Sequence, residues 1–232
     1  MGDFAIIAEG YTDQVVLKNI LIGLLSTDDD EPVINFEHPP YSEAAQRGNY
    51  PPGGWTLVTQ YFDQGRYKQA LQTNTYLVVH IDTDVSEQYG VAKGAKGAEV
   101  QLISDVVAMF RSRIEDSIWQ AHGERFIFAI TVHEIECWLL PPLFDTQKAK
   151  MAKITGCFTL ADERLRQMNR PPLRDKEGRK DGKAYDRASA VYLKRAEVLR
   201  LSSSNISLQA FVREIERRNI TLPTERNGGD GP

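Results

Sequence analysis

Short apolar runs alternate with longer amphipathic segments over the first 140 residues of the chain. The short runs are rich in β-branched residues and predict strands at 4–8, 33–36, 75–82 and 125–132. Between them, apolar residues at helical spacing predict helices that start near Thr12 and cover 55–72 and 98–120. Such alternation is typical of a parallel sheet with right-handed crossovers. We therefore expect an α/β, Rossmann-like fold with about four parallel strands.

The pattern changes after Leu140, where we find only helical periodicity. Helices are predicted near 146–154, 160–168, 185–201 and 207–218. Pro141 and Pro142 mark the change, so we expect an α/β domain over 1–140 and a C-terminal helical appendage over 141–223. Residues 224–232 offer nothing apolar to bury, and we expect a disordered tail there.

Composition narrows the classes of partner. Apolar residues make up 41% and charged residues 26% of the chain, values of an ordinary globular protein. The net charge of -4 gives no overall attraction for nucleic acid, so any such binding needs local basic patches. We see no signal peptide and no apolar run long enough for a membrane span. The two cysteines form no CxxC pattern, and we expect a cytoplasmic protein with free thiols and no membrane contact.

Acidic residues follow two of the predicted strands. Glu9 ends the first strand and is followed by Gly10 and Asp13, whereas Asp82-Thr83-Asp84 closes the third. The carboxyl ends of neighbouring parallel strands meet at one edge of a sheet, so these acids should cluster. Clustered carboxylates favour a bound cation, and their hard oxygens suit Mg²⁺ or Mn²⁺. The alternative is a solvated junction in which aspartates cap a turn.

The order Glu9-Gly-Tyr-Thr-Asp13 and then Asp82-Thr-Asp84 resembles the TOPRIM domain. This domain is shared by primases, topoisomerases, recombination-repair proteins and OLD-family nucleases. The resemblance covers roughly residues 4–140 and implies that Glu9, Asp82 and Asp84 are catalytic and bind the metal. Asp13 matches a further acidic position of the primase-like form of the first motif.

A third acidic motif, Glu134-Ile-Glu136-Cys-Trp-Leu-Leu140, follows the fourth strand. It resembles the E-x-E-x-W-L segment of small OLD-like TOPRIM proteins, which implies that Glu136, and less strongly Glu134, binds a second metal ion. The alternative is a helix start, where acids favour the positive end of the dipole. His133-Glu134 begins like the zinc motif H-E-x-x-H, but Cys137 replaces the second histidine. A zinc pair of His133 and Cys137 has no evident further ligand in the sequence.

Basic residues in two loops are candidates for contacts with a nucleic-acid backbone. Lys93 and Lys96 lie in a glycine-bearing loop after the third strand, although a flexible connection is the other interpretation. The stretch 164–187 supplies Arg174, Arg179 and Lys180, as a mobile phosphate clamp or as solvated surface. OLD-like nucleases use a lysine beyond the acidic motifs, and we assign that catalytic role to Lys183.

These features predict a Mg²⁺- or Mn²⁺-dependent endonuclease that cleaves DNA or structured RNA by a two-metal mechanism. The resemblance further implies a bacterial phage-defence effector that is controlled by an ATPase partner. A catalytically weak TOPRIM-fold binding or signalling module is the alternative. An unrelated α/β phosphatase is disfavoured because its Asp-x-Asp should follow the first strand. The chain is too short for the topoisomerase apparatus, and no primase zinc module is evident.

Overall fold

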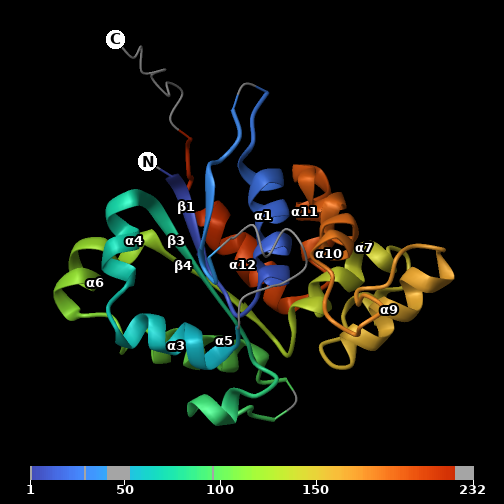
Figure 1. Cartoon of the computed structure of the whole chain (residues 1–232), viewed down its shortest axis with the longest axis horizontal. Coiled ribbons are helices and arrows are strands. Elements are labelled where there is room, and N and C mark those ends of the chain that lie inside the picture. Colours follow the sequence, from blue (N-terminus) through green and yellow to red (C-terminus); the bar gives the residue numbers. More distant parts are fainter. Residues whose placement is uncertain (1, 29, 41–52, 96, 223–232) are drawn as a thin grey trace.

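The computed structural model describes residues 2–28, 30–40, 53–95 and 97–222, which fold around a four-stranded parallel sheet (Figure 1). The strands are β1 (Gly2–Ile7), β2 (Ile34–His38), β3 (Asn74–Asp82) and β4 (Phe126–Thr131). They pair in the order β2-β1-β3-β4, with every pair parallel. The expected α/β fold with about four parallel strands is confirmed.

The strand order places a switch point between β1 and β3. The chain leaves β1 toward β2 on one side and then crosses to β3 on the other, so the loops after β1 and β3 diverge. Ile7 lies opposite Val79, and Asp82 lies opposite Thr131 on β4. In open α/β sheets, ligands bind in the crevice outside the carboxyl ends of the strands at such a point. The first two acidic motifs both lie at this edge.

Helices cover both faces of the sheet (Figure 1). One face packs against α3 (Trp55–Asp63), α4 (Tyr67–Thr73) and α5 (Glu99–Arg111), with α6 (Asp116–His122) beside them. The other face packs against α1 (Tyr11–Leu25) and α12 (Ile206–Arg217). Alternation along β3 sends Leu77, Val79 and Ile81 to the first core and Val78 to the second. His80 and Asp82 share the parity of Val78 and lie on the α1 side.

The helical segments after β4 belong to the same core as the second face of the sheet. They are η3 (Ile135–Leu139), α7 (Leu140–Leu143), α8 (Lys148–Met151), α9 (Cys157–Gln167), α10 (Gly182–Ser189), η4 (Ala190–Leu193) and α11 (Arg195–Ser202). Trp138, Tyr192 and Phe211 join one buried cluster with Phe4 and Ile6. Apolar packing is therefore continuous across the boundary expected at Pro141-Pro142. The expected tail 224–232 lies outside the described residues.

Several predicted helices are interrupted. The helix expected over 55–72 is two helices, because Gly65 adopts a left-handed conformation at φ 67°. The helix expected over 98–120 is likewise α5 followed by α6. Thr12 does not cap α1, which starts at Tyr11, and its hydroxyl donates to the Asp13 carboxylate instead. Short 3₁₀ turns, η1 (Ser86–Tyr89) and η2 (Gly123–Arg125), complete the connections.

The helix expected over 185–201 consists of α10, η4 and α11. It is interrupted at Lys194, whose backbone is extended. Just before this break η4 runs against α1, where a side chain on Gly23 would meet the carbonyl oxygen of Tyr192 at 1.8 Å. The glycine allows this close approach. In the part of the chain that the structure describes, no helix combines the length and apolar character needed to cross a membrane.

The prediction of free thiols is wrong. Cys137 of η3 and Cys157 at the start of α9 form a disulfide, with their Cα atoms 4.9 Å apart. The two residues are 20 positions apart in sequence, so no local spacing pattern signals the pair. The packing of η3 against α9 brings them to a separation that is usual for a disulfide.

Candidate metal centre at the carboxyl ends of β1 and β3

Glu9 and Asp82 meet directly at the switch point. The Glu9 carboxylate accepts a hydrogen bond from the backbone N–H of Asp82 at 2.8 Å. Behind Glu9, the N–H of Gly54 donates to the Glu9 carbonyl at 2.8 Å. A side chain on Gly53 would come within 1.9 Å of that same oxygen. Gly53 and Gly54, directly before α3, thus fit closely against the main chain of Glu9.

The Asp82-Thr83-Asp84 segment is fastened to the end of β4. The hydroxyl of Thr131, which lies opposite Asp82, donates to the Asp82 carboxylate. The N–H groups of Thr83 and Asp84 donate to the carbonyl of His133 at 2.9 and 3.0 Å, and the His133 N–H donates to the Thr83 hydroxyl at 2.8 Å. These bonds connect the second acidic motif to the start of the third.

A buried histidine separates Asp13 from Asp82. His80 Nδ1 lies 3.9 Å from Asp13 Oδ2, and His80 Nε2 lies 3.5 Å from Asp82 Oδ1. Burial, aided by the nearby Lys180 ammonium, lowers the pKa of His80 to about 3. The imidazole is therefore neutral at physiological pH and contributes no charge to balance the two carboxylates.

Lys180 supplies the positive charge of the cluster. Its Nζ lies 2.8 Å from Oε1 of Glu136, a carboxylate with no exposed surface. The hydroxyl of Tyr185, from α10, donates to the same oxygen. The other oxygen, Oε2, is buried and has no hydrogen-bond partner among the described residues. About 40% of the Lys180 side chain remains exposed, so the ammonium reaches the acids from the surface.

Three carboxyl groups of this cluster, those of Glu9, Asp13 and Asp82, have raised pKa values. Burial raises the pKa of Glu9 to about 7, and repulsion from Asp13 and Asp84 adds to the effect. Burial also raises the pKa of Asp13 to about 6, against the opposing field of Lys180. The pKa of Asp82 is raised by burial and by the neighbouring Asp13 and Glu9 carboxyls. A further cation would relieve this repulsion.

Carboxylate oxygens and a buried, unpartnered Glu136 Oε2 are a donor set that fits a hard divalent cation. No three of these acids bring ligand atoms within 4.8 Å of one another, however; among the described residues only His133, Glu134 and Cys137 do so. Direct ligation of one ion by Glu9, Asp82 and Asp84 together is thus not present in this geometry. Mg²⁺ is usually held by one or two carboxylates plus water, which the spacing does allow.

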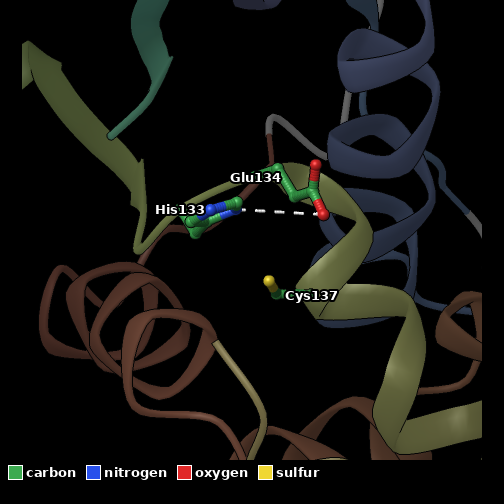
Figure 2. Close-up of side chains that lie close together, drawn as sticks. All are labelled: His133, Glu134 and Cys137. Atoms are coloured by element: carbon green, nitrogen blue, oxygen red, sulfur yellow. Dashed lines mark ion pairs between the residues drawn. The ribbon is translucent and has the colours of Figure 1, made fainter. Parts of the chain in front are cut away.

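The structure separates the two glutamates of the third motif. Glu136 joins the acidic cluster, whereas Glu134 faces His133 (Figure 2). The Glu134 carboxylate accepts from the N–H of Phe158 at 2.8 Å. It is therefore positioned by the start of α9, apart from the cluster around Lys180.

Lys183, to which we assigned the catalytic role, lies outside the acidic cluster. Lys183 is exposed and lines a pocket of about 570 Å³ together with Tyr11, Lys18 and Asp186. Lys180 lies among the acids instead, although the sequence suggested it only as a contact for a nucleic-acid backbone. A tight turn explains why Lys180 lies there. Residues Arg174 and Lys180 pair as an antiparallel bridge, and the Asp175 carboxylate caps the turn between them.

The other residues that we expected to contact a nucleic-acid backbone do not lie together. Lys93 lines a pocket of about 430 Å³ beside Thr83 and His133, next to the acidic loop. Lys96 lies outside the described residues. The Arg174 guanidinium stacks over the ring of Phe158, and Arg179 pairs with Asp175 at 2.8 Å.

The sequence analysis did not name His80, Thr131 or Tyr185 as residues of this centre, and it assigned Lys180 only to contacts with a nucleic-acid backbone. His80 alone had a signal, since it shares the strand face of Asp82. Comparison with protein-family models, with curated proteins and with solved structures found no match for this chain.

Proposed function

We propose that the protein is a TOPRIM-like, Mg²⁺- or Mn²⁺-dependent nuclease that hydrolyses phosphodiester bonds. The observation that carries the proposal is the meeting of Glu9 and Asp82 at the switch point of the parallel sheet, with buried Asp13 and Glu136 beside them. Acids with raised pKa values in such a crevice are characteristic of a functional site, because a stable fold gains nothing from their repulsion.

The acids divide between two cation positions. Glu9, Asp82 and Asp84 would border the first, where water would complete the coordination because the three do not converge on one ion directly, and Asp13 and Glu136 would border the second. Ions held there would supply an activated water as the nucleophile and charge stabilisation for the leaving oxygen. Thr131 and the Asp82 N–H hold the Asp82 and Glu9 carboxylates in place for this role.

Lys180 takes the role that we expected for Lys183. Its ammonium reaches the acids on a partly exposed side chain, so it can approach a phosphoryl group lying over them. There it would neutralise charge that develops on the phosphoryl oxygens in the transition state. The pockets bordered by Lys18 and Lys183 on one side and by Lys93 on the other provide charges for the flanking backbone.

The setting is part of this proposal and rests on the motif resemblance alone. We propose a bacterial phage-defence effector, restrained or activated by an ATPase partner, with DNA or structured RNA as substrate. A second candidate, a binding module with little activity, is favoured by the contact of Lys180 with the acids and by their wide spacing.

Cleavage of plasmid DNA, single-stranded DNA and total RNA with Mg²⁺ or Mn²⁺ tests the proposal. Asp82→Asn should abolish cleavage, whereas the matched Asp28→Asn on an exposed loop should not. A wild-type protein that binds Mg²⁺ in calorimetry but cleaves none of these substrates would favour the binding module. Cleavage that persists in Asp82→Asn would refute the assignment of the centre.

A further inference from the structure

A second group of metal-ligating side chains lies outside the acidic cluster. One ligand atom each from His133, Glu134 and Cys137 lies within 4.8 Å of the other two. Figure 2 shows the imidazole and the Glu134 carboxylate facing each other, with the Cys137 sulfur directed toward them. The His133 Nδ1 atom lies 3.9 Å from Glu134 Oε1 and is buried with no hydrogen-bond partner among the described residues.

The disulfide supplies the fourth ligand. Cys157 Sγ is bonded to Cys137 Sγ and so lies one bond from this group, although it does not itself lie within 4.8 Å of all three ligand atoms. Together the four residues offer one nitrogen, one oxygen and two sulfurs, a set that suits tetrahedral Zn²⁺. Thiolates are soft ligands that Mg²⁺ does not favour, so this site is chemically distinct from the acidic cluster.

The surrounding structure already holds these ligands. His133 adopts a left-handed backbone at φ 76°, which is uncommon for a residue with a side chain. Its N–H and carbonyl groups are bonded to Thr83 and Asp84, which maintain that conformation. The Phe158 N–H orients the Glu134 carboxylate. Strained backbone and outer hydrogen bonds that orient ligands are typical of metal sites.

The structure assigns to His133, Glu134, Cys137 and Cys157 a zinc site that opens when the Cys137–Cys157 disulfide is reduced. A dithiol reductant transfers two electrons and two protons, the Sγ–Sγ bond breaks, and the dithiol becomes a disulfide. Zinc then replaces the two thiol protons, which pass to solvent. The sulfurs separate to about 3.8 Å, the spacing of two thiolates on a tetrahedral zinc ion. The site does not depend on the proposed nuclease activity.

The ion has a route to the ligands. Cys137 and Cys157 are fully buried, whereas 34% of the His133 side chain and 20% of the Glu134 side chain are exposed. His133 also lines the pocket of about 430 Å³ that contains Ile154 and Thr155. Zinc and reductant therefore approach from this pocket, and the disulfide form offers no thiolate to bind the metal.

The test uses the full chain, oxidised or reduced with a phosphine that is then removed without oxygen. Chelator competition measures zinc, and Co²⁺ substitution reports thiolate ligation through its ligand-to-metal charge-transfer bands. We expect the reduced protein to bind one ion with these bands and the oxidised protein to bind none here. His133→Asn introduces a side chain that tolerates the left-handed backbone. This change should weaken zinc binding by at least about 100-fold, more than the 10–100-fold cost of losing a hydrogen-bond partner of a ligand. His122→Asn should leave it unchanged.

Two further variants make the outcome decisive. A Cys137→Ser/Cys157→Ser protein should lose the cobalt bands while keeping the acidic cluster. Asp82→Asn should keep the cobalt bands. Failure of the zinc proposal can therefore be distinguished from failure of the nuclease proposal. If the double serine variant does not fold, His133→Asn in the reduced protein decides alone. Absence of zinc uptake on reduction, or zinc binding that survives His133→Asn without thiolate bands, would overturn the assignment.

Discussion

Removal of the Lys180 charge is the sharpest test of the acidic cluster. Lys180→Met keeps most of the aliphatic stem and deletes the ammonium, which lies 5.7 Å from the centre of the Tyr185 ring. The change leaves Glu136, which has no exposed surface, without its cationic partner at 2.8 Å. It also removes the one charge that lowers the pKa values of both Glu9 and Asp13.

The size of the expected loss of stability in Lys180→Met follows from the burial of the ion pair. Breaking a buried ion pair by removing one partner costs about 3–5 kcal/mol. Because 40% of the Lys180 side chain is exposed and Tyr185 still donates to Glu136, we expect a cost below that range, about 2–3 kcal/mol. For a chain of this length that corresponds to a fall in Tm of roughly 5–10 °C. The matched control Lys183→Met, three residues on and exposed, should stay within about 0.5 kcal/mol.

The assay is thermal unfolding in EDTA at pH 8 and pH 5. Glu9 and Asp13 have pKa values of about 7 and about 6, so both are mostly ionised at pH 8 and mostly neutral at pH 5. The cost of Lys180→Met should therefore shrink at the lower pH. Glu136→Gln in the Lys180→Met background should recover much of the loss, as a double-mutant cycle measures. Equal, small effects of Lys180→Met and Lys183→Met at both pH values would refute the assigned contact.

Two further predictions concern the same cluster. Because the folded pKa values of Glu9 and Asp13 are raised above those of the unfolded chain, the folded state binds more protons between about pH 4 and pH 7. The free energy of unfolding in EDTA should therefore fall as pH rises through that window, and Glu9→Gln should flatten the slope while Asp28→Asn should not. Millimolar Mg²⁺ should raise the Tm at pH 8, by mass action on the folded state, and should raise it more in Lys180→Met than in Lys183→Met. An equal rise in both would mean that the ion binds elsewhere.

The sequence predicted the sheet edge well because its signals are local. Alternation of strands and helices implies parallel pairing, and parallel pairing places the ends of β1 and β3 together. The sequence alone thus predicted that Glu9 and Asp82 lie side by side. The face of Asp82 also followed from the two-residue period that it shares with His80. Each of these inferences needs only residues within one strand and its neighbour.

The residues that were missed depend on tertiary packing. Lys180 reaches the acids because a seven-residue turn, capped by Asp175, returns the chain toward β1 and β3. Tyr185 arrives through the packing of α10 against α1, where Asn19 donates to Ser189 at 2.8 Å. Nothing in a sequence window around Lys183 distinguishes it from Lys180. The turn before α10 places Lys180 among the acids, whereas the first turn of α10 carries Lys183 to the surface.

The two proposed metal sites contain glutamates that are only two positions apart in sequence, Glu134 and Glu136. After β4, the chain enters the 3₁₀ turn η3 at Ile135, with Glu136 directed to Lys180 and Glu134 left beside His133. Ile135 is fully buried between these glutamates. Glu136 therefore joins the oxygen donors of the acidic cluster, whereas Glu134 joins the nitrogen and sulfur donors of the proposed zinc site. Because the His133 main chain also holds Thr83 and Asp84, an ion at the sulfur-bearing side would stiffen the loop that carries the acidic motif.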